Sequence, residues 1–272
     1  MVNAAILRLV RVGYGNFRKD TESLRLQFRE KNTADAAAVQ SYPAKLREIL
    51  QAEGYSEEQV YNADETGIYY KMLPDKTLAV RTDERKKEGY KQAKDHLTLL
   101  FCVNATVKHN LKPLCIGKSR MPRCFHHINV NCLLFLYRNS KNSWMTGEIF
   151  DQWFFAEFVP SVRKHLRAKR LEEKAILLLD NCPAHLPAER PRTRDGKIQV
   201  EYLPKNTTSK LQPLVQGVIA IFEQHCRQNL VRQMIESELS VTDFLKKLTI
   251  KDFFYIGGDS WNVLRAETIS HC

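Results

Sequence analysis

The sequence lacks the long apolar run that a membrane-spanning helix requires. Its longest apolar runs, such as residues 175–179, are far shorter than the roughly 20 residues that cross a bilayer. The first residues, MVNAAILRLVRVGYGNF, contain only a short apolar part and no clear small-residue cleavage site, so we predict no signal peptide. Repeats and low-complexity tracts are also missing. With 43% hydrophobic and 27% charged residues, the composition is typical of a soluble globular protein.

Cysteine spacing of the zinc-binding type is absent as well. The chain has seven cysteines, and no two of them are spaced as C-x-x-C, so a structural zinc site is unsupported. Several of the cysteines lie in apolar, strand-like runs, where a free thiol packs as a small core residue. This usage suits a reducing compartment, the cytosol or the nucleus.

Negative charge is in deficit. Lys and Arg number 42 against 31 Asp and Glu, which gives a formal net charge of +11. Basic residues crowd two stretches, residues 81–94 and residues 163–170. The second stretch contains Arg163, Lys164, Arg167, Lys169 and Arg170. Such a basic surface could bind a phosphate polyanion such as a nucleic acid. From charge alone, the alternative that these stretches are only solvent-exposed faces is about equally well supported.

Apolar runs bounded by polar turns predict five strands. The predicted strands are residues 60–72, 96–104, 111–116, 174–179 and 198–203. The NATVKHN segment after the second strand is typical of a hairpin, so the second and third strands should be antiparallel. A run as apolar as residues 174–179 indicates a central strand that is buried on both faces.

Helical periodicity marks the segments around and between these strands. We predict helices over residues 36–52, from Thr146 to Val162, over residues 214–235, and one or two more after residue 244. Pro43 should make the first helix irregular, and Gly54 should end it. Thr146 is a suitable N-cap, and we interpret the Trp and Phe residues that follow it as core rather than as a base-stacking platform. The order of elements predicts a mixed α/β layer.

Asp180 closes the buried strand and is followed by Asn-Cys-Pro-Ala-His. An acid at the C-terminal end of a buried strand lies at the rim of an α/β sheet, where ligands bind. The alternative is a structural role, because Asp at a strand end often caps the next turn. The intact LLLDNCPAH segment favours a site residue by roughly three to one.

Asp64 lies in the NADETG segment of the first strand, close to Asn62, Glu65 and Thr66. Because side chains alternate along a strand, Asp64 and Glu65 point to opposite faces, and only one of them can face Asp180. Two carboxylates on adjacent strands can bind Mg²⁺ or Mn²⁺, and two such ions roughly 3.5–4 Å apart can activate water against a phosphodiester. Such a pair of ions normally requires a third carboxylate.

Several motifs together resemble one known family. They are NADETGIYY, KPLCIGKS with PRCF, LLLDNCPAH, and YLPKNTTSKLQP with QGVI. In combination they resemble the DDE-type transposase domain of the pogo/Tigger group, with the jerky and Tigger-derived proteins as the nearest likeness, from about residue 35 to the C-terminus. The resemblance implies a ribonuclease H-like α/β fold, a five-stranded mixed sheet flanked by helices.

By position, Asp64 matches the first catalytic acid of the family and Asp180 the second. The third acid follows Gln-Pro and one apolar residue and precedes Gln-Gly-Val-Ile, and here that position is Val215. The resemblance implies that the ancestral site bound Mg or Mn. Because valine cannot coordinate a metal, it also implies that Asp64 and Asp180 bind such an ion weakly or not at all here. Glu201 has no motif support, and Glu223 should lie roughly 12 Å further along a helix, so we expect neither to replace the missing acid.

These observations lead to three alternatives. The first is a domesticated or decaying transposase-derived protein that binds DNA non-specifically through phosphates, with its nuclease chemistry lost. The second is a residual Mg/Mn-dependent endonuclease, and the third is a fold remnant that acts only through protein contacts. The resemblance implies a nucleus location and leaves a homodimer open. We expect residues 1–35 to be an N-terminal remnant without the family's helix-turn-helix region, and residues 36–272 to form the ribonuclease H-like domain.

Overall fold

The computed structural model describes residues 36–71, 96–182, 191–205, 207, 211–212 and 217–264. Several predicted features lie outside the described residues. They are the N-terminal remnant over residues 1–35, the basic stretch 81–94, and Val215.

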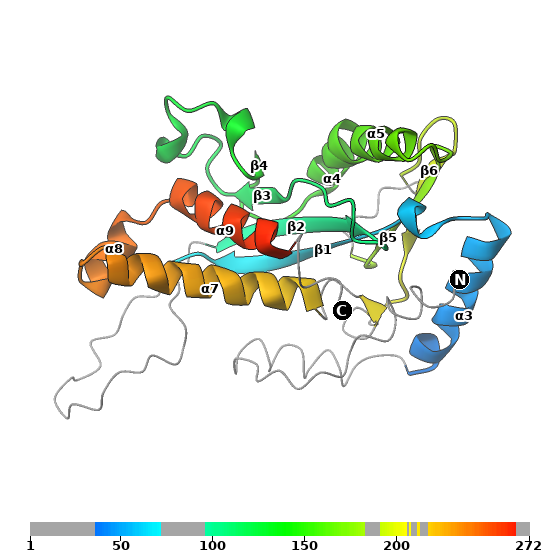
Figure 1. The fold of residues 1–272 in the computed structure, drawn as a ribbon, viewed down its shortest axis with the longest axis horizontal. Coiled ribbons are helices and arrows are strands. Elements are labelled where there is room, and N and C mark those ends of the chain that lie inside the picture. Colours follow the sequence, from blue (N-terminus) through cyan, green and yellow to red (C-terminus); the bar gives the residue numbers. More distant parts are fainter. Residues whose placement is uncertain are drawn as a thin grey trace.

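A mixed sheet forms the centre of the described structure (Figure 1). Its strands are β1 (Val60–Tyr69), β2 (His96–Asn104), β3 (Leu114–Gly117), β4 (Leu136–Asn139), β5 (Ala175–Leu179) and β6 (Ile198–Tyr202). The strand order is β4-β3-β2-β1-β5-β6. Strand β2 is antiparallel to β1 and β3, whereas β5 is parallel to both β1 and β6. The five predicted strands are all present, in the ribonuclease H-like arrangement that the resemblance implies.

The prediction of a five-stranded sheet is wrong by one strand. The sheet has six strands, because β4 pairs in parallel with β3 at the outer edge. The residues of β4, LYRN, are half-buried or exposed and show no clean alternation of apolar and polar side chains. The sequence pattern therefore carries no strand signal there, and pairing with β3 decides the conformation.

The predicted helices are present around the sheet. They are α3 (Ala36–Ala52), α4 (Gly147–Trp153), α5 (Val159–Ala168), α7 (Ile219–Glu236), α8 (Val241–Lys247) and α9 (Ile250–Leu264). A π-helical turn, η4 (Phe154–Phe158), joins α4 to α5, and η1 (Glu57–Gln59), η2 (Arg123–Phe125) and η3 (Val130–Cys132) are short 3-10 turns. In the described ranges, no helix is long and apolar enough to cross a membrane.

Local signals account for where these helices begin and end. Thr146 caps α4, since its hydroxyl accepts a hydrogen bond from the Ile149 amide at 3.3 Å. Pro43 lies inside α3, as predicted. Gly54 follows α3 with a φ of +64°, a left-handed conformation that glycine adopts without a steric penalty.

Helices cover both faces of the sheet (Figure 1). On one face, α4, η4 and α5 bury Phe150, Trp153 and Phe158 against the strands, which confirms that these aromatic residues belong to the core. On the other face, α7 and α9 pack through Phe222 and Trp261. Near the β5 side of this second face, α3 adds a smaller apolar cluster. We call the two surfaces of the sheet the α4 face and the α7 face.

Candidate functional site

The pairing of β1 with β5 brings the two predicted acids together. The strands are parallel, with Val60 opposite Ile176 and Asn62 opposite Leu178. Continued by two residues, the same register places Asp64 opposite Asp180. Neighbouring strands lie roughly 4.8 Å apart, so the two carboxylates start from adjacent backbone positions.

Both acids also belong to the same face of the sheet. In β1, Tyr61 and Ala63 pack on the α4 face, so Asp64 takes the α7 face by alternation. In β5, Leu177 and Leu179 pack on the α4 face, which directs Asp180 toward the α7 face in the same way. Asp64 is 6% exposed, and Asp180 is half-buried. The structure thus selects Asp64, rather than Glu65, as the acid on the side of Asp180.

Two buried amide side chains lie beside this pair. Asn62 Nδ2 donates to the Leu178 carbonyl oxygen at 3.1 Å, and Gln212 Nε2 donates to the Ala63 carbonyl oxygen at 2.9 Å. Gln212, which is fully buried, thereby bonds to β1 one residue beyond the Asn62–Leu178 pair, where the pairing of β1 with β5 ends. Among the described residues, no donor reaches the buried Asn62 Oδ1 or Gln212 Oε1.

The donor set suits a hard divalent cation. Carboxylate and amide oxygens are ligands that Mg²⁺ and Mn²⁺ accept, and buried acceptors without a donor are costly unless something else satisfies them. Sequence reasoning named Asn62 among the oxygen groups but missed Gln212, although Gln212 lies in the YLPKNTTSKLQP motif that carries part of the resemblance. Within the described part of the chain, no group of three or more His, Cys, Asp or Glu side chains could hold a metal ion.

Glu223 of α7 contacts β1 at Thr66. Its Oε1 accepts a hydrogen bond from the Thr66 hydroxyl at 2.9 Å, and its Oε2 lies 3.5 Å from Arg227 Nη2. Thr66 is two residues beyond Asp64 on the same face, a step of roughly 6.7 Å along a strand. Glu223 therefore joins α7 to the far part of β1. Glu201 lies opposite Leu178, two residues before the position of Asp180.

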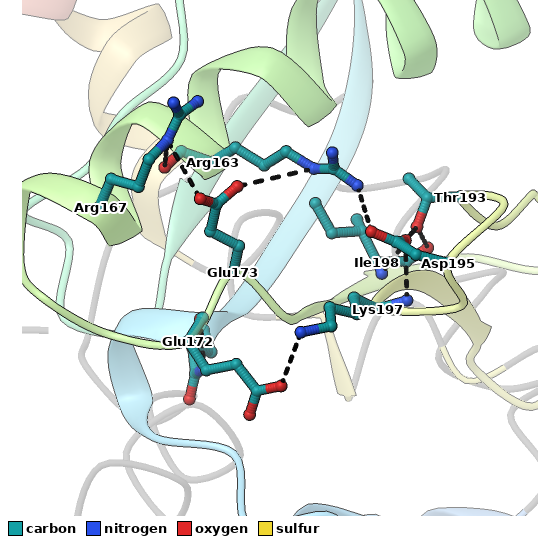
Figure 2. Close-up of polar contacts among 9 residues, drawn as sticks. Arg163, Arg167, Glu172, Glu173, Thr193, Asp195, Lys197 and Ile198 are labelled. Atoms are coloured by element: carbon teal, nitrogen blue, oxygen red, sulfur yellow. Dashed lines mark hydrogen bonds and ion pairs between the residues drawn. The ribbon is translucent and has the colours of Figure 1, made fainter.

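The basic stretch on α5 is largely engaged with acids (Figure 2). Arg163 Nη2 lies 2.7 Å from Asp195 Oδ2, and Arg167 Nε lies 3.2 Å from Glu173 Oε1. Lys169 Nζ lies 3.9 Å from Glu58 Oε1. The charge excess that the sequence shows at residues 163–170 is therefore reduced locally by these acids.

Hydrogen bonds hold one of these acids in its charged form. The Thr193 hydroxyl and the Lys197 amide donate to Asp195, and these bonds lower the pKa of the Asp195 carboxyl, with Arg163 adding to the effect. Lys197 also pairs with Glu172, so the acids and bases alternate across this surface in Figure 2. An ion-pair network that includes Arg163, Arg167 and Lys197 occupies this part of the molecule.

Comparison with known proteins identifies the relatives of the chain. Residues 94–272 match the DDE superfamily endonuclease family. The Jerky protein homolog of Homo sapiens is 37% identical over 237 residues, which is 86% of this chain and 40% of that protein. Tigger transposable element-derived protein 7 of Homo sapiens is 38% identical over 185 residues, 66% of this chain and 33% of that protein. The chain thus spans less than half the length of these curated relatives.

Solved structures offer a more distant likeness. The Mos1 mariner paired end complex with Mn matches 95% of this chain and 65% of its own chain, with 13% identity and a TM-score of 0.43. The ribonuclease H-like assignment rests on the strand order and directions described above. The family match and the identity with the curated relatives show that this chain belongs to the DDE superfamily endonuclease family, with Jerky and Tigger transposable element-derived proteins among its relatives.

Proposed function

We propose that the chain is a transposase-derived nucleic-acid-binding protein whose phosphodiester-cleaving chemistry is lost. The observation that carries the proposal is Val215 at the position of the third acid, in a motif that otherwise keeps its register. Asp64 and Asp180 remain in register on adjacent strands, so two arms of the site are retained without the third.

Charge is the physical reason for the loss. Two divalent ions close together repel each other, and carboxylates must offset that repulsion. Val215 contributes neither charge nor a ligand, and Glu223 is held beside Thr66. Asp64 and Asp180, with the Asn62 and Gln212 amide oxygens nearby, fit one ion better than two. A bound Mg²⁺ or Mn²⁺ would polarise a phosphodiester and its attacking water, and the two aspartates would hold and orient that ion.

Nucleic-acid binding is the retained activity that we propose. The net charge of +11 supports non-specific binding through phosphates. The ion pairs of Arg163 and Arg167 make α5 a poor contributor, so the binding surface should lie elsewhere. A nuclear location follows from this proposal, because the DNA partner is there.

A cleavage assay tests the loss of chemistry. Purified protein is incubated with supercoiled DNA and Mn²⁺, beside the variants Val215→Asp and Asp180→Ala. We expect no nicking by the native chain and measurable nicking by Val215→Asp, because an added carboxylate restores the third ligand. Val215→Asn is the matched control, since the asparagine side chain has a shape similar to that of aspartate but carries no charge. Native cutting that disappears in Asp180→Ala would overturn the proposal.

Residual endonuclease activity is the second candidate function. The buried oxygen groups beside Asp64 favour it, because a single ion bound there could support slow cleavage. Nicking by the native chain that requires Mn²⁺ and Asp180 would establish this candidate.

A fold that acts only through protein contacts is the third candidate. The pairing of the α5 basic residues with acids favours it, because that surface no longer attracts phosphates strongly. The absence of measurable DNA binding at low salt would support this candidate over the first two.

A further inference from the structure

Three rings form a continuous row at one end of the sheet. The ring centroids of Tyr69 and His96 are 6.0 Å apart, and those of His96 and Trp144 are 5.3 Å apart. Trp144 is 64% exposed and Tyr69 is 49% exposed, whereas most aromatic side chains of the described structure are buried. We call Tyr69, His96 and Trp144 the aromatic row.

Strand register explains how these residues meet. Tyr69 at the end of β1 pairs directly with His96 at the start of β2, so both side chains lie on the α4 face. The loop after β4 brings Trp144 to them, and it is fixed by a 2.7 Å hydrogen bond from the Ser140 hydroxyl to the Trp144 carbonyl oxygen. Tyr69 and Gly67 are exposed on this face, so the end of the sheet is open here.

The floor beside the row contains polar atoms that the fold leaves unsatisfied. Among the described residues, the buried Thr98 hydroxyl and the buried His96 Nε2 have no hydrogen-bond partner. Thr98 is 4% exposed and lies opposite Gly67, which has no side chain to cover it. In the part of the chain that the structure describes, a Cβ atom at Gly67 would meet only His96, at 3.9 Å, which leaves room above the strand. Unsatisfied buried groups in native structures call for an explanation, such as a missing ligand.

Positive charge flanks the row. Continuing the pairing of β2 with β3 by two residues places Lys118 beside His96. Burial first, and then the charge of Lys118, lower the pKa of His96, which agrees with that placement. Lys141 lies three residues before Trp144. Both lysines are exposed, and in the described ranges neither has an acid partner within ion-pair distance.

We propose that the aromatic row binds an unpaired base of single-stranded nucleic acid. The base would stack on the Trp144 and Tyr69 rings, and a neighbouring phosphate would contact Lys118. Single exposed aromatic residues are common on surfaces, but a row of rings with flanking cations is the combination that single-strand binding uses. The proposal rests on the nucleic-acid binding proposed above and adds its site and the strandedness of the ligand.

Tryptophan fluorescence gives a direct test. The chain has three tryptophans, and Trp153 and Trp261 are only 3% and 5% exposed. Quenching by a short oligo(dT) strand therefore reports on Trp144. We expect quenching by the single strand and little quenching by the corresponding dA·dT duplex. The Trp144→Ala variant should lose about tenfold in affinity for the strand by fluorescence anisotropy.

Controls separate this inference from the proposed function. Trp144→Phe should keep most of the affinity, and Tyr255→Ala, which removes a 54% exposed ring from α9, should change it little. Binding of the strand without quenching, or equal losses in Trp144→Ala and Tyr255→Ala, would overturn the aromatic site and leave nucleic-acid binding in place. If the protein binds neither the single strand nor the duplex, both the aromatic site and the proposed nucleic-acid binding are overturned. The aromatic row would then be a contact for a protein partner.

Discussion

At the scale of single residues, η1 places Glu58 in a network of hydrogen bonds. Its Oε2 lies 2.8 Å from His165 Nε2 and accepts a 2.8 Å bond from Asn104 Nδ2. The His165 ring stacks on that of His109, with centroids 4.2 Å apart, and His109 Nδ1 lies 2.7 Å from the Tyr61 hydroxyl oxygen. One carboxylate thus connects η1, β2 and α5.

This network predicts a loss of stability in acid. Burial raises the pKa of Glu58, but the hydrogen bonds from His165, Thr106 and Asn104 outweigh it and hold the pKa below the ordinary value of 4.5. The stabilisation is therefore complete above that value and is lost as the pH falls through the lower folded-state pKa. Chemical denaturation of native protein and Glu58→Gln should differ by about 1–2 kcal/mol at neutral pH and converge in acid.

The exposed Glu236 provides the matched control for this prediction. Glu236→Gln removes the same charge at the end of α7 and should leave the pH profile of stability unchanged. A constant difference between native protein and Glu58→Gln at all pH values would contradict the role of ionised Glu58.

At the scale of elements, close packing joins α9 to the loop before β4. A Cβ atom at Gly258 would lie 2.6 Å from the Leu134 Cβ and closer still to its Cδ1. One at Gly257 would lie 2.9 Å from the Phe135 ring. Phe135 is fully buried among the residues of α7 and α9. The Leu-Leu-Phe run at residues 133–135 therefore serves as part of the core on the α7 face.

The prediction at this scale concerns Gly258. Gly258→Ala should destabilise the protein by about 1–3 kcal/mol, because the added methyl group has no room beside Leu134. Asp259→Ala, at the exposed neighbouring position, should have a small effect. Thermal unfolding measures both, and the double variant Gly258→Ala with Leu134→Ala should recover part of the loss. An unchanged Tm in Gly258→Ala would mean that α9 does not approach the loop this closely.

At the scale of the whole molecule, the prediction concerns salt and charge. DNA affinity should fall steeply as salt rises. Each phosphate of duplex DNA that the protein neutralises contributes about −0.9 to the slope of log affinity against log salt concentration. Replacing Arg163 and Arg167 by Gln should leave this slope unchanged, since both already pair with acids. Replacing Lys118 by Gln should reduce the slope for single-stranded DNA by about 0.7, because Lys118 would contact one phosphate of the bound strand. Salt titrations of DNA affinity compare the three proteins, and a smaller slope for the arginine variant would place DNA on α5.

Sequence patterns predict much of the fold because the signals for these strands and helices are local. The strand His96–Asn104 and the N-cap Thr146 were predicted as the structure has them, since an apolar run and a capping hydroxyl act within a few residues. Strand β4 was missed because its conformation depends on pairing with β3 rather than on its own residues. Helical periodicity predicts a helix over residues 214–235, and in the described residues helix α7 begins at Ile219.

Part of the candidate site likewise follows from the sequence, and the rest follows only from the tertiary structure. The sequence by itself determined the residue types, with Asp64, Asp180 and Val215 at the positions that the resemblance aligns with three acids. It also determined the net charge, because both depend only on which residues are present. Only the tertiary structure decided which groups meet. Strand pairing sets Asp64 opposite Asp180, Asp195 lies against Arg163, and Trp144 joins Tyr69 and His96. Contacts between residues far apart in the chain follow from sheet order and helix packing, and no local pattern contains them.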